Sequence, residues 1–214
     1  MHLRLGLSKR KHLPVWRILD GTYRLWDLNA LKFLGLLNNL KVREVGDNLY
    51  SLTIFGVNLE MFGAYTKLLV TELEIWKKWY LPPFSLEGET VLDAGAGCGE
   101  TAAFYLAQGA RKVVAVEIDP VAFDLLRRNV VSNSMNVEAY NESFSERFLS
   151  PNIDFAKIDV EGSEIFLLNL ERIDIPCLVE THSQEVRQNI LNKFPEFHEV
   201  FDTSKKISFI VNWP

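Results

Sequence analysis

Residues 91–99 read Val91-Leu92-Asp93-Ala94-Gly95-Ala96-Gly97-Cys98-Gly99, a short hydrophobic run followed by three glycines at alternate positions. The run predicts a strand, and residues 100–108 after it predict a helix. Glycine permits positive φ angles and has no side chain to block a ligand, and the first turn of a helix presents unpaired N–H groups. This stretch therefore predicts a strand–turn–helix unit whose turn approaches a bound molecule closely.

The residue after the third glycine limits which molecule that is. A dinucleotide-binding G-x-G-x-x-G turn holds a pyrophosphate at the helix N-terminus and would need glycine at position 100, where this chain has Glu100. A carboxylate there, with Asp93 at the strand end, repels a pyrophosphate and favours a ligand with cationic groups. S-Adenosylmethionine, with an ammonium and a sulfonium beside a carboxylate, is the expected cofactor. Its expected contacts in this stretch are Asp93, Ala94, Gly95, Gly97 and Gly99.

Two further strand ends offer groups to the same cofactor. The second hydrophobic run ends in Glu117, followed by Ile118. The carboxylate of Glu117 could accept two hydrogen bonds from a ribose diol, the role of the acidic residue that follows the loop in nucleotide folds; otherwise it caps a helix or lies on the surface. Asn141 and Glu142 follow the third strand and could bind the adenine amino group, although Asn141 could simply end a strand.

After residue 84 the chain alternates between strand-like and helical segments. Alternating βα units predict an α/β fold with a doubly wound, mostly parallel sheet. The last two runs, 199–201 and 207–212, are separated by Asp-Thr-Ser-Lys-Lys and predict a terminal hairpin. The other strands are predicted at 90–92, 112–117, 136–140, 154–158 and 177–180, and the helices at 100–108, 120–133, 163–170 and 183–194.

The first 83 residues predict an N-terminal helical and β-hairpin extension. Apolar residues at helical intervals over 13–40 predict two short helices, and residues 42–62 predict two or three short strands. A helix over 65–79 should end at Leu81-Pro82-Pro83, because proline removes a donor and disfavours helix just before it. We expect a boundary there, with residues 1–83 as an extension that could serve as a substrate lid and residues 84–214 as the cofactor-binding domain.

The composition is that of one globular core. The 214 residues are 48% hydrophobic and 24% charged, and the two cysteines, Cys98 and Cys177, argue against a disulfide framework. This favours a reducing compartment, and we expect a cytoplasmic protein. No stretch approaches the roughly 18 uncharged apolar residues of a membrane span, so none is predicted.

Charge is unevenly distributed along the chain. Residues 1–43 carry nine Lys and Arg against two Asp, whereas the remainder carries 14 Lys and Arg against 26 Asp and Glu. The basic arm could contact nucleic acid or an anionic membrane surface, or it could lie on its own acidic domain. We favour the last interpretation, and oligomeric state is not predicted.

These motifs together resemble the class I, Rossmann-like methyltransferases, and within them the FkbM-like family. They run over roughly residues 88–183, from the glycine turn through Val116-Glu117 and the helix 125–129 with Asn133. The most specific pieces are Lys157-Ile158-Asp159-Val160-Glu161-Gly162-Ser163-Glu164 and the later Glu180 with His182. The resemblance implies S-adenosylmethionine-dependent methylation, commonly O-methylation of a small-molecule or glycan hydroxyl, in a seven-stranded sheet with an antiparallel final strand.

Candidate reacting groups follow the fourth and fifth strands of the predicted domain. Asp159, Glu161 and His182 are the expected catalytic residues, because ligands bind at the carboxyl edge of open α/β sheets. A hydroxyl acceptor must lose its proton, and His182 is the preferred base since an unperturbed imidazole has a pKa near neutrality. Asp159 could instead face the sulfonium of the cofactor.

Other roles for these residues stay open. His182 could be a surface residue before Ser183, and Glu161 and Glu164 could be favourable charges in a helix first turn. Asp159, Glu180 and His182 could also gather a divalent cation. The spacing specifies no metal geometry, so we assign no metal site.

The leading hypothesis is a methyltransferase that acts on the hydroxyl of a small molecule or carbohydrate. One alternative is an RNA methyltransferase that uses the basic arm, which the acidic body and the absence of an Asn-Pro-Pro-Tyr type motif after the fourth strand argue against. The other is a non-catalytic module that binds the cofactor without turnover.

Overall fold

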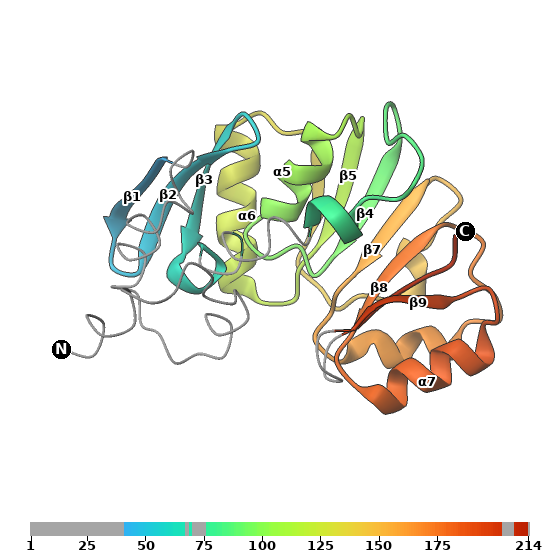
Figure 1. Ribbon diagram of the computed structural model, residues 1–214. Helices are drawn as coiled ribbons and strands as arrows, with labels where there is room; N and C mark the ends of the chain where they lie inside the picture. Colours follow the sequence, from blue (N-terminus) through green and yellow to red (C-terminus); the bar gives the residue numbers. More distant parts are fainter. Residues whose placement is uncertain (1–40, 67–68, 70–75, 203–207, 214) are drawn as a thin grey trace, which may run out of the picture.

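The computed structural model describes residues 41–66, 69, 76–202 and 208–213, and a seven-stranded sheet forms its centre (Figure 1). The strand order is β6-β5-β4-β7-β8-β10-β9. The first five are mutually parallel, and β10 runs antiparallel to both neighbours. The predicted α/β sheet and terminal hairpin are thereby confirmed. The strands are β4 (Thr90–Ala94), β5 (Lys112–Val116), β6 (Val137–Tyr140), β7 (Phe155–Ile158), β8 (Cys177–Thr181), β9 (His198–Asp202) and β10 (Ser208–Val211).

Helical segments cover both faces of the sheet. α5 (Glu100–Ala107) and α6 (Pro120–Ser132) pack on one face, and the 3₁₀ helix η3 (Ser163–Asn169) and α7 (Gln184–Lys193) pack on the other. A short 3₁₀ turn, η2 (Glu146–Phe148), follows β6. The 163–170 helix is a 3₁₀ helix, a geometry typical of short pieces, and it starts after two successive positive-φ residues, Glu161 and Gly162.

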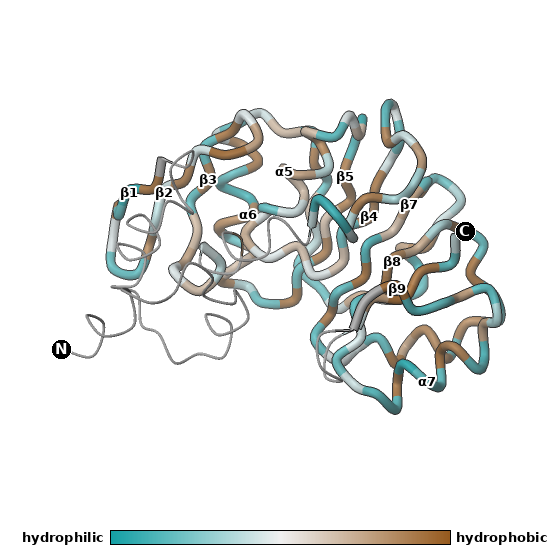
Figure 2. The backbone as a smooth tube through the Cα atoms, in the orientation of Figure 1, coloured by the Kyte–Doolittle hydropathy of each residue, from teal (hydrophilic) through white to brown (hydrophobic). Residues whose placement is uncertain are grey.

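The sheet separates two hydrophobic cores. Val91 belongs to the core shared with α5 and α6, whereas the next residue, Leu92, belongs to the core under η3 and α7. Residues alternate between the two cores because successive side chains of a strand point to opposite faces of the sheet. β4 and β7 are buried along their whole length because both faces of the sheet are covered. Figure 2 shows hydrophobic residues along the central strands and a mixture of hydrophilic and hydrophobic residues on α7.

The N-terminal part of the described chain is a three-stranded antiparallel meander of β1 (Lys41–Gly46), β2 (Leu49–Ile54) and β3 (Val57–Phe62). Its Leu52 and Met61 lie in the same buried cluster as Leu126 of α6. Before the double proline, residues 76–80 form a π-helix, η1 (Trp76–Tyr80). The helices expected over 13–40 lie outside the described residues, as does part of 65–79. The boundary at residue 83 and the lid stay predictions.

Within the described ranges, no helix is both long and apolar enough to cross a membrane.

Candidate functional site

The glycine turn after β4 passes directly against the end of β7. The amides of Gly95 and Ala96 donate to the Val116 carbonyl at 2.9 and 3.1 Å. Gly95 has a φ of 77°, and a Cβ atom there would lie 1.7 Å from the carbonyl oxygen of Asp159. Only glycine fits, because the obstacle is backbone. The turn therefore packs its backbone tightly against the ends of β5 and β7.

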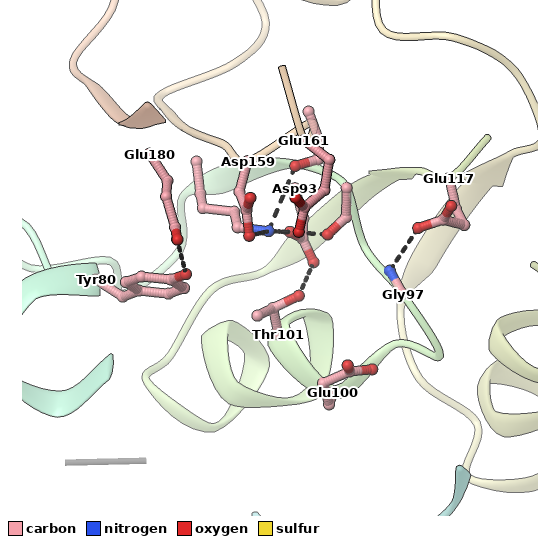
Figure 3. A network of polar contacts seen from close by, with 12 residues as sticks. Tyr80, Asp93, Gly97, Glu100, Thr101, Glu117, Asp159, Glu161 and Glu180 are labelled. Atoms are coloured by element: carbon pink, nitrogen blue, oxygen red, sulfur yellow. Dashed lines mark hydrogen bonds and ion pairs between the residues drawn. The ribbon is translucent and has the colours of Figure 1, made fainter. Parts of the chain in front are cut away.

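Glu117 closes the turn from the neighbouring strand. Its Oε2 accepts a hydrogen bond from the Gly97 amide at 2.8 Å (Figure 3). Its Oε1 accepts one from the Asp119 amide at 2.7 Å. Burial raises the pKa of this carboxyl, and the two amides oppose that rise. A carboxylate has about four lone-pair positions, so two are left for a ligand. Glu117 is 7% exposed and lines a cavity.

That cavity has a volume of about 330 Å³ and lies at the carboxyl edge of β4, β5 and β7. Its volume is within the range of small-molecule sites. Seven predicted site residues line it: Gly95, Gly97, Glu117, Ile118, Glu142, Asp159 and Glu161. Five others do not: Asp93, Ala94, Gly99, Asn141 and His182.

Asp93 lies beneath the turn, in a buried ion pair with Lys157. The two side chains are 0% and 1% exposed, and the Nζ of Lys157 lies 3.2 Å from Oδ1 of Asp93. Thr101 donates to the other oxygen of Asp93 at 2.5 Å, and Lys157 donates to the Gly95 carbonyl at 2.9 Å. Burial alone lowers the pKa of Lys157, but the carboxylates of Asp93, Asp159 and Glu180 raise it above its usual value. Asp93 thus supports the turn instead of reaching the cavity.

The other residues outside the cavity also have structural contacts. Ala94 is buried in the core under η3. Gly99 begins α5 with a φ of 93°, and a Cβ there would lie 2.7 Å from a methyl group of Leu126. Asn141 donates to the carbonyls of Glu117 and Ile118, so it shapes the loop after β5.

His182 lies beside the cavity among four carboxylates. Its Nδ1 is 2.6 Å from Oε1 of Glu164, whose side chain is fully buried, and its Nε2 is 3.4 Å from Glu161. Asp159 and Glu180 each lie 3.7 Å from Nε2. Burial lowers the pKa of His182, but Glu164 and the other carboxylates raise it overall to about 9. The imidazole is therefore protonated at neutral pH. His182 was preferred as the base because an unperturbed imidazole has a pKa near neutrality, and this condition does not hold here.

The donor set at this end of the cavity also suits a divalent cation. Asp159, Glu161 and His182 each offer one ligand atom within 4.8 Å of the others. Nδ1 of His182 is held by Glu164, the kind of outer contact that orients metal-bound histidines. Glu180, the other acid considered with them, accepts a hydrogen bond from the hydroxyl of Tyr80 at 2.7 Å. A divalent cation bound by these residues is therefore still the alternative role that the sequence analysis left open, and we assign no metal site.

Several lining residues were not predicted. Tyr65, Trp76 and Tyr80 come from the segment before the double proline, and their aromatic character is the only sequence signal that they carry. Glu100, considered only as a repulsive charge, also lines the cavity and accepts the Cys98 amide at 2.8 Å. Burial raises its pKa to about 8.

Comparisons with known proteins find similarity to methyltransferases over parts of the chain. The family model for ribosomal protein L11 methyltransferase (PrmA) matches residues 66–158. A probable ribosomal RNA small subunit methyltransferase A from Methanosphaera stadtmanae is 32% identical over 74 residues, 34% of this chain and 25% of that protein. The mouse electron transfer flavoprotein beta subunit lysine methyltransferase is 41% identical over 54 residues, 25% of this chain and 21% of that protein. The matches thus span about a quarter of these curated relatives.

A solved structure extends the likeness beyond the matched segments. M. jannaschii TYW2 in complex with AdoMet has a TM-score of 0.54 and 17% identity, with 80% of this chain and 87% of that chain covered. At this identity the likeness concerns the fold, and the seven-stranded order with one antiparallel strand agrees with it. The chain therefore has the fold of the class I S-adenosylmethionine-dependent methyltransferases.

Proposed function

We propose that this protein is an S-adenosylmethionine-dependent methyltransferase that binds its cofactor between the glycine turn after β4 and Glu117. The observation that carries the proposal is the pairing of an obligatory glycine at 95 with a buried carboxylate at 117, on two sides of one cavity of about 330 Å³. The PrmA family model, which spans this turn and Glu117, supports it. Glu117 would bind the ribose, and the glycine turn would lie against the amino-acid part.

The acceptor that we propose is a hydroxyl of a small molecule or carbohydrate. When bound, the cofactor supplies a methyl group on a sulfonium, and the displacement forms a C–O bond as the C–S bond breaks. The acceptor proton must pass to a base within hydrogen-bond reach. Asp159 lines the cavity, and its Oδ1 is buried without a hydrogen-bond partner among the described residues, so its carboxylate is the proposed base. The FkbM-like octet 157–164 that contains it supports a hydroxyl acceptor.

A second candidate is an amine acceptor such as a protein lysine. Carboxylates at Asp159 and Glu161 would attract a cationic side chain, and the mouse relative is a lysine methyltransferase. The same charges oppose the phosphates of RNA near the cavity. Salt-dependent tRNA binding that is lost on deletion of residues 1–17 would favour RNA instead.

Calorimetry with S-adenosylhomocysteine tests the cofactor site. The wild type should bind, Glu117→Gln should bind about 10- to 100-fold more weakly because a charge-assisted ribose contact is lost, and Glu185→Gln on the exposed face of α7 should match the wild type. Wild-type protein that does not bind would refute the proposed function.

Transfer of a labelled methyl group to hydroxylated small molecules, glycosides and lysine peptides then identifies the acceptor class. Asp159→Asn should lower kcat for a hydroxyl acceptor while cofactor binding persists. Transfer to lysine peptides alone would replace the hydroxyl proposal by the amine candidate, and binding without turnover on every acceptor would favour the non-catalytic module.

A further inference from the structure

Strand β3 has an unusual neighbour along its outer edge. It is the last strand of the β1-β2-β3 meander, so β2 pairs with only one of its edges. On the other edge, Asn133 of the α6 C-terminus accepts from the Asn58 amide at 2.8 Å and donates to the Asn58 carbonyl at 2.9 Å. One helical turn earlier, Asn129 accepts from the Glu60 amide and donates to the Glu60 carbonyl, both at 2.8 Å. Two asparagine side chains thus occupy the place of a neighbouring strand.

The spacing explains why this pairing works. A carboxamide carries the same donor and acceptor as a peptide group. Residues 58 and 60 send their backbone groups to the same edge about 6.6 Å apart, since a strand rises about 3.3 Å per residue. Residues 129 and 133 are about 6 Å apart along the helix, since a helix rises 1.5 Å per residue. The match fixes one register of β3 against α6.

Asn129 makes one further contact, which reaches the glycine turn. Its Nδ2 also donates to the carbonyl of Cys98 at 2.8 Å, and the side chain is 2% exposed. Both amide hydrogens and the amide oxygen of Asn129 are therefore used inside the protein. Cys98 lies between Gly97, whose amide binds Glu117, and Gly99, where α5 begins. A single side chain thus joins the meander, α6 and the turn.

The register of β3 also determines where a wall of the cavity lies. Tyr65 follows β3 by three residues and lines the cavity. Its ring carbon Cε1 would be 3.0 Å from a Cβ placed at Gly97, so the ring already packs closely against the turn. A shift of β3 along α6 would move Tyr65 relative to the turn.

We propose that Asn129 is a positioning residue for the cofactor site: with Asn133 it fixes the register of β3 against α6, and it alone also holds the glycine turn, through the Cys98 carbonyl. The inference rests on the proposed function. It makes the N-terminal meander part of the cofactor site, although only Asn129 reaches the turn itself.

Variants at the two positions separate this role from a purely structural one. Asn133→Ala should lower the urea midpoint while its affinity for S-adenosylhomocysteine stays within about threefold of the wild type. Asn129→Ala, measured well below its unfolding temperature, should weaken that affinity about tenfold, the effect of one buried hydrogen bond. Asn192→Ala on exposed α7 is the matched control. Equal affinity in Asn129→Ala and the wild type would overturn the inference, whereas a wild type that does not bind would overturn the proposed function.

Hydrogen exchange on the wild type provides a test that does not depend on folding of a variant. Added S-adenosylhomocysteine should slow exchange of the Asn58 and Glu60 amides, which bond to the two carboxamides, together with that of the Gly97 and Cys98 amides. Protection confined to the turn would show that the meander is not coupled to the site and would overturn the inference.

Discussion

Replacing Glu100 by glutamine should stabilise the protein at alkaline pH. The Glu100 side chain is 7% exposed, and burial is the main reason that its pKa rises from 4.5 to about 8. Asp93 adds to the rise, whereas Lys157 and the Cys98 amide oppose it. Glutamine has no charge to bury, and its amide oxygen can still accept the hydrogen bond from Cys98.

The sign and the size follow from proton linkage. Because the folded pKa is raised, the unfolded chain releases the Glu100 proton near pH 4.5 and the folded protein keeps it until about pH 8. Folding is then disfavoured by about 1.4 kcal/mol per pH unit across that interval, which gives an upper limit of about 5 kcal/mol. Below pH 4.5 the glutamate contributes no penalty.

Urea unfolding of the wild type, Glu100→Gln and the control Glu185→Gln at pH 5.5, 7 and 8.5 measures this effect. The stability gained by Glu100→Gln should grow with pH. His182, whose folded pKa is about 9 against 6.5, also loses its stabilising contribution as pH rises, but it does so in all three proteins and cancels in the difference. A difference that is constant with pH, or a less stable Glu100→Gln at pH 8.5, would refute the argument.

Three further substitutions should have distinct effects. Gly95→Ala should cost several kcal/mol in urea unfolding, because its Cβ would lie 1.7 Å from the Asp159 carbonyl oxygen at a φ of 77°. Lys157→Met leaves Asp93 as an unpaired buried charge, and should cost about 3–5 kcal/mol; equal stability would contradict the ion pair. An NMR titration should find the imidazole of His182 protonated until about pH 9, and Glu164→Gln should lower that pKa; a wild-type value near 6.5 would contradict the four-carboxylate setting.

The sheet and the glycine turn were predictable because their signals are local. Each βα unit has a hydrophobic run followed by a helical pattern, and the turn at 95–99 needs glycine for backbone reasons that any such turn shares. Glu117 could be found because it ends a strand beside that turn. Asp119 before Pro120 likewise caps α6 as its sequence indicates, by accepting the Val121 amide at 2.9 Å.

The rest depends on pairings between distant residues. Asp93 was expected to face the cofactor, but Lys157, 64 positions later, turns it into a buried ion pair. His182 was chosen for its ordinary pKa, which Glu164 and three other carboxylates raise. Asn129 and Glu60 are 69 residues apart, so no local pattern indicates that one pairs with the backbone of the other.

These pairings balance the positive charge at the cavity wall and leave acidic side chains on its lining, an arrangement that suits the proposed reaction. Lys157 lies at the cavity wall, but its charge is balanced by Asp93 and Asp159 and its protons are directed to backbone carbonyls. The carboxyl groups of Glu117 and Glu161 also line the cavity. Methyl transfer turns a sulfonium into a neutral thioether, so it removes one positive charge from a site lined by negative ones. In the proposed site these carboxylates would hold the neutral product less tightly than the cationic cofactor, so the charge lost in the reaction would favour product release.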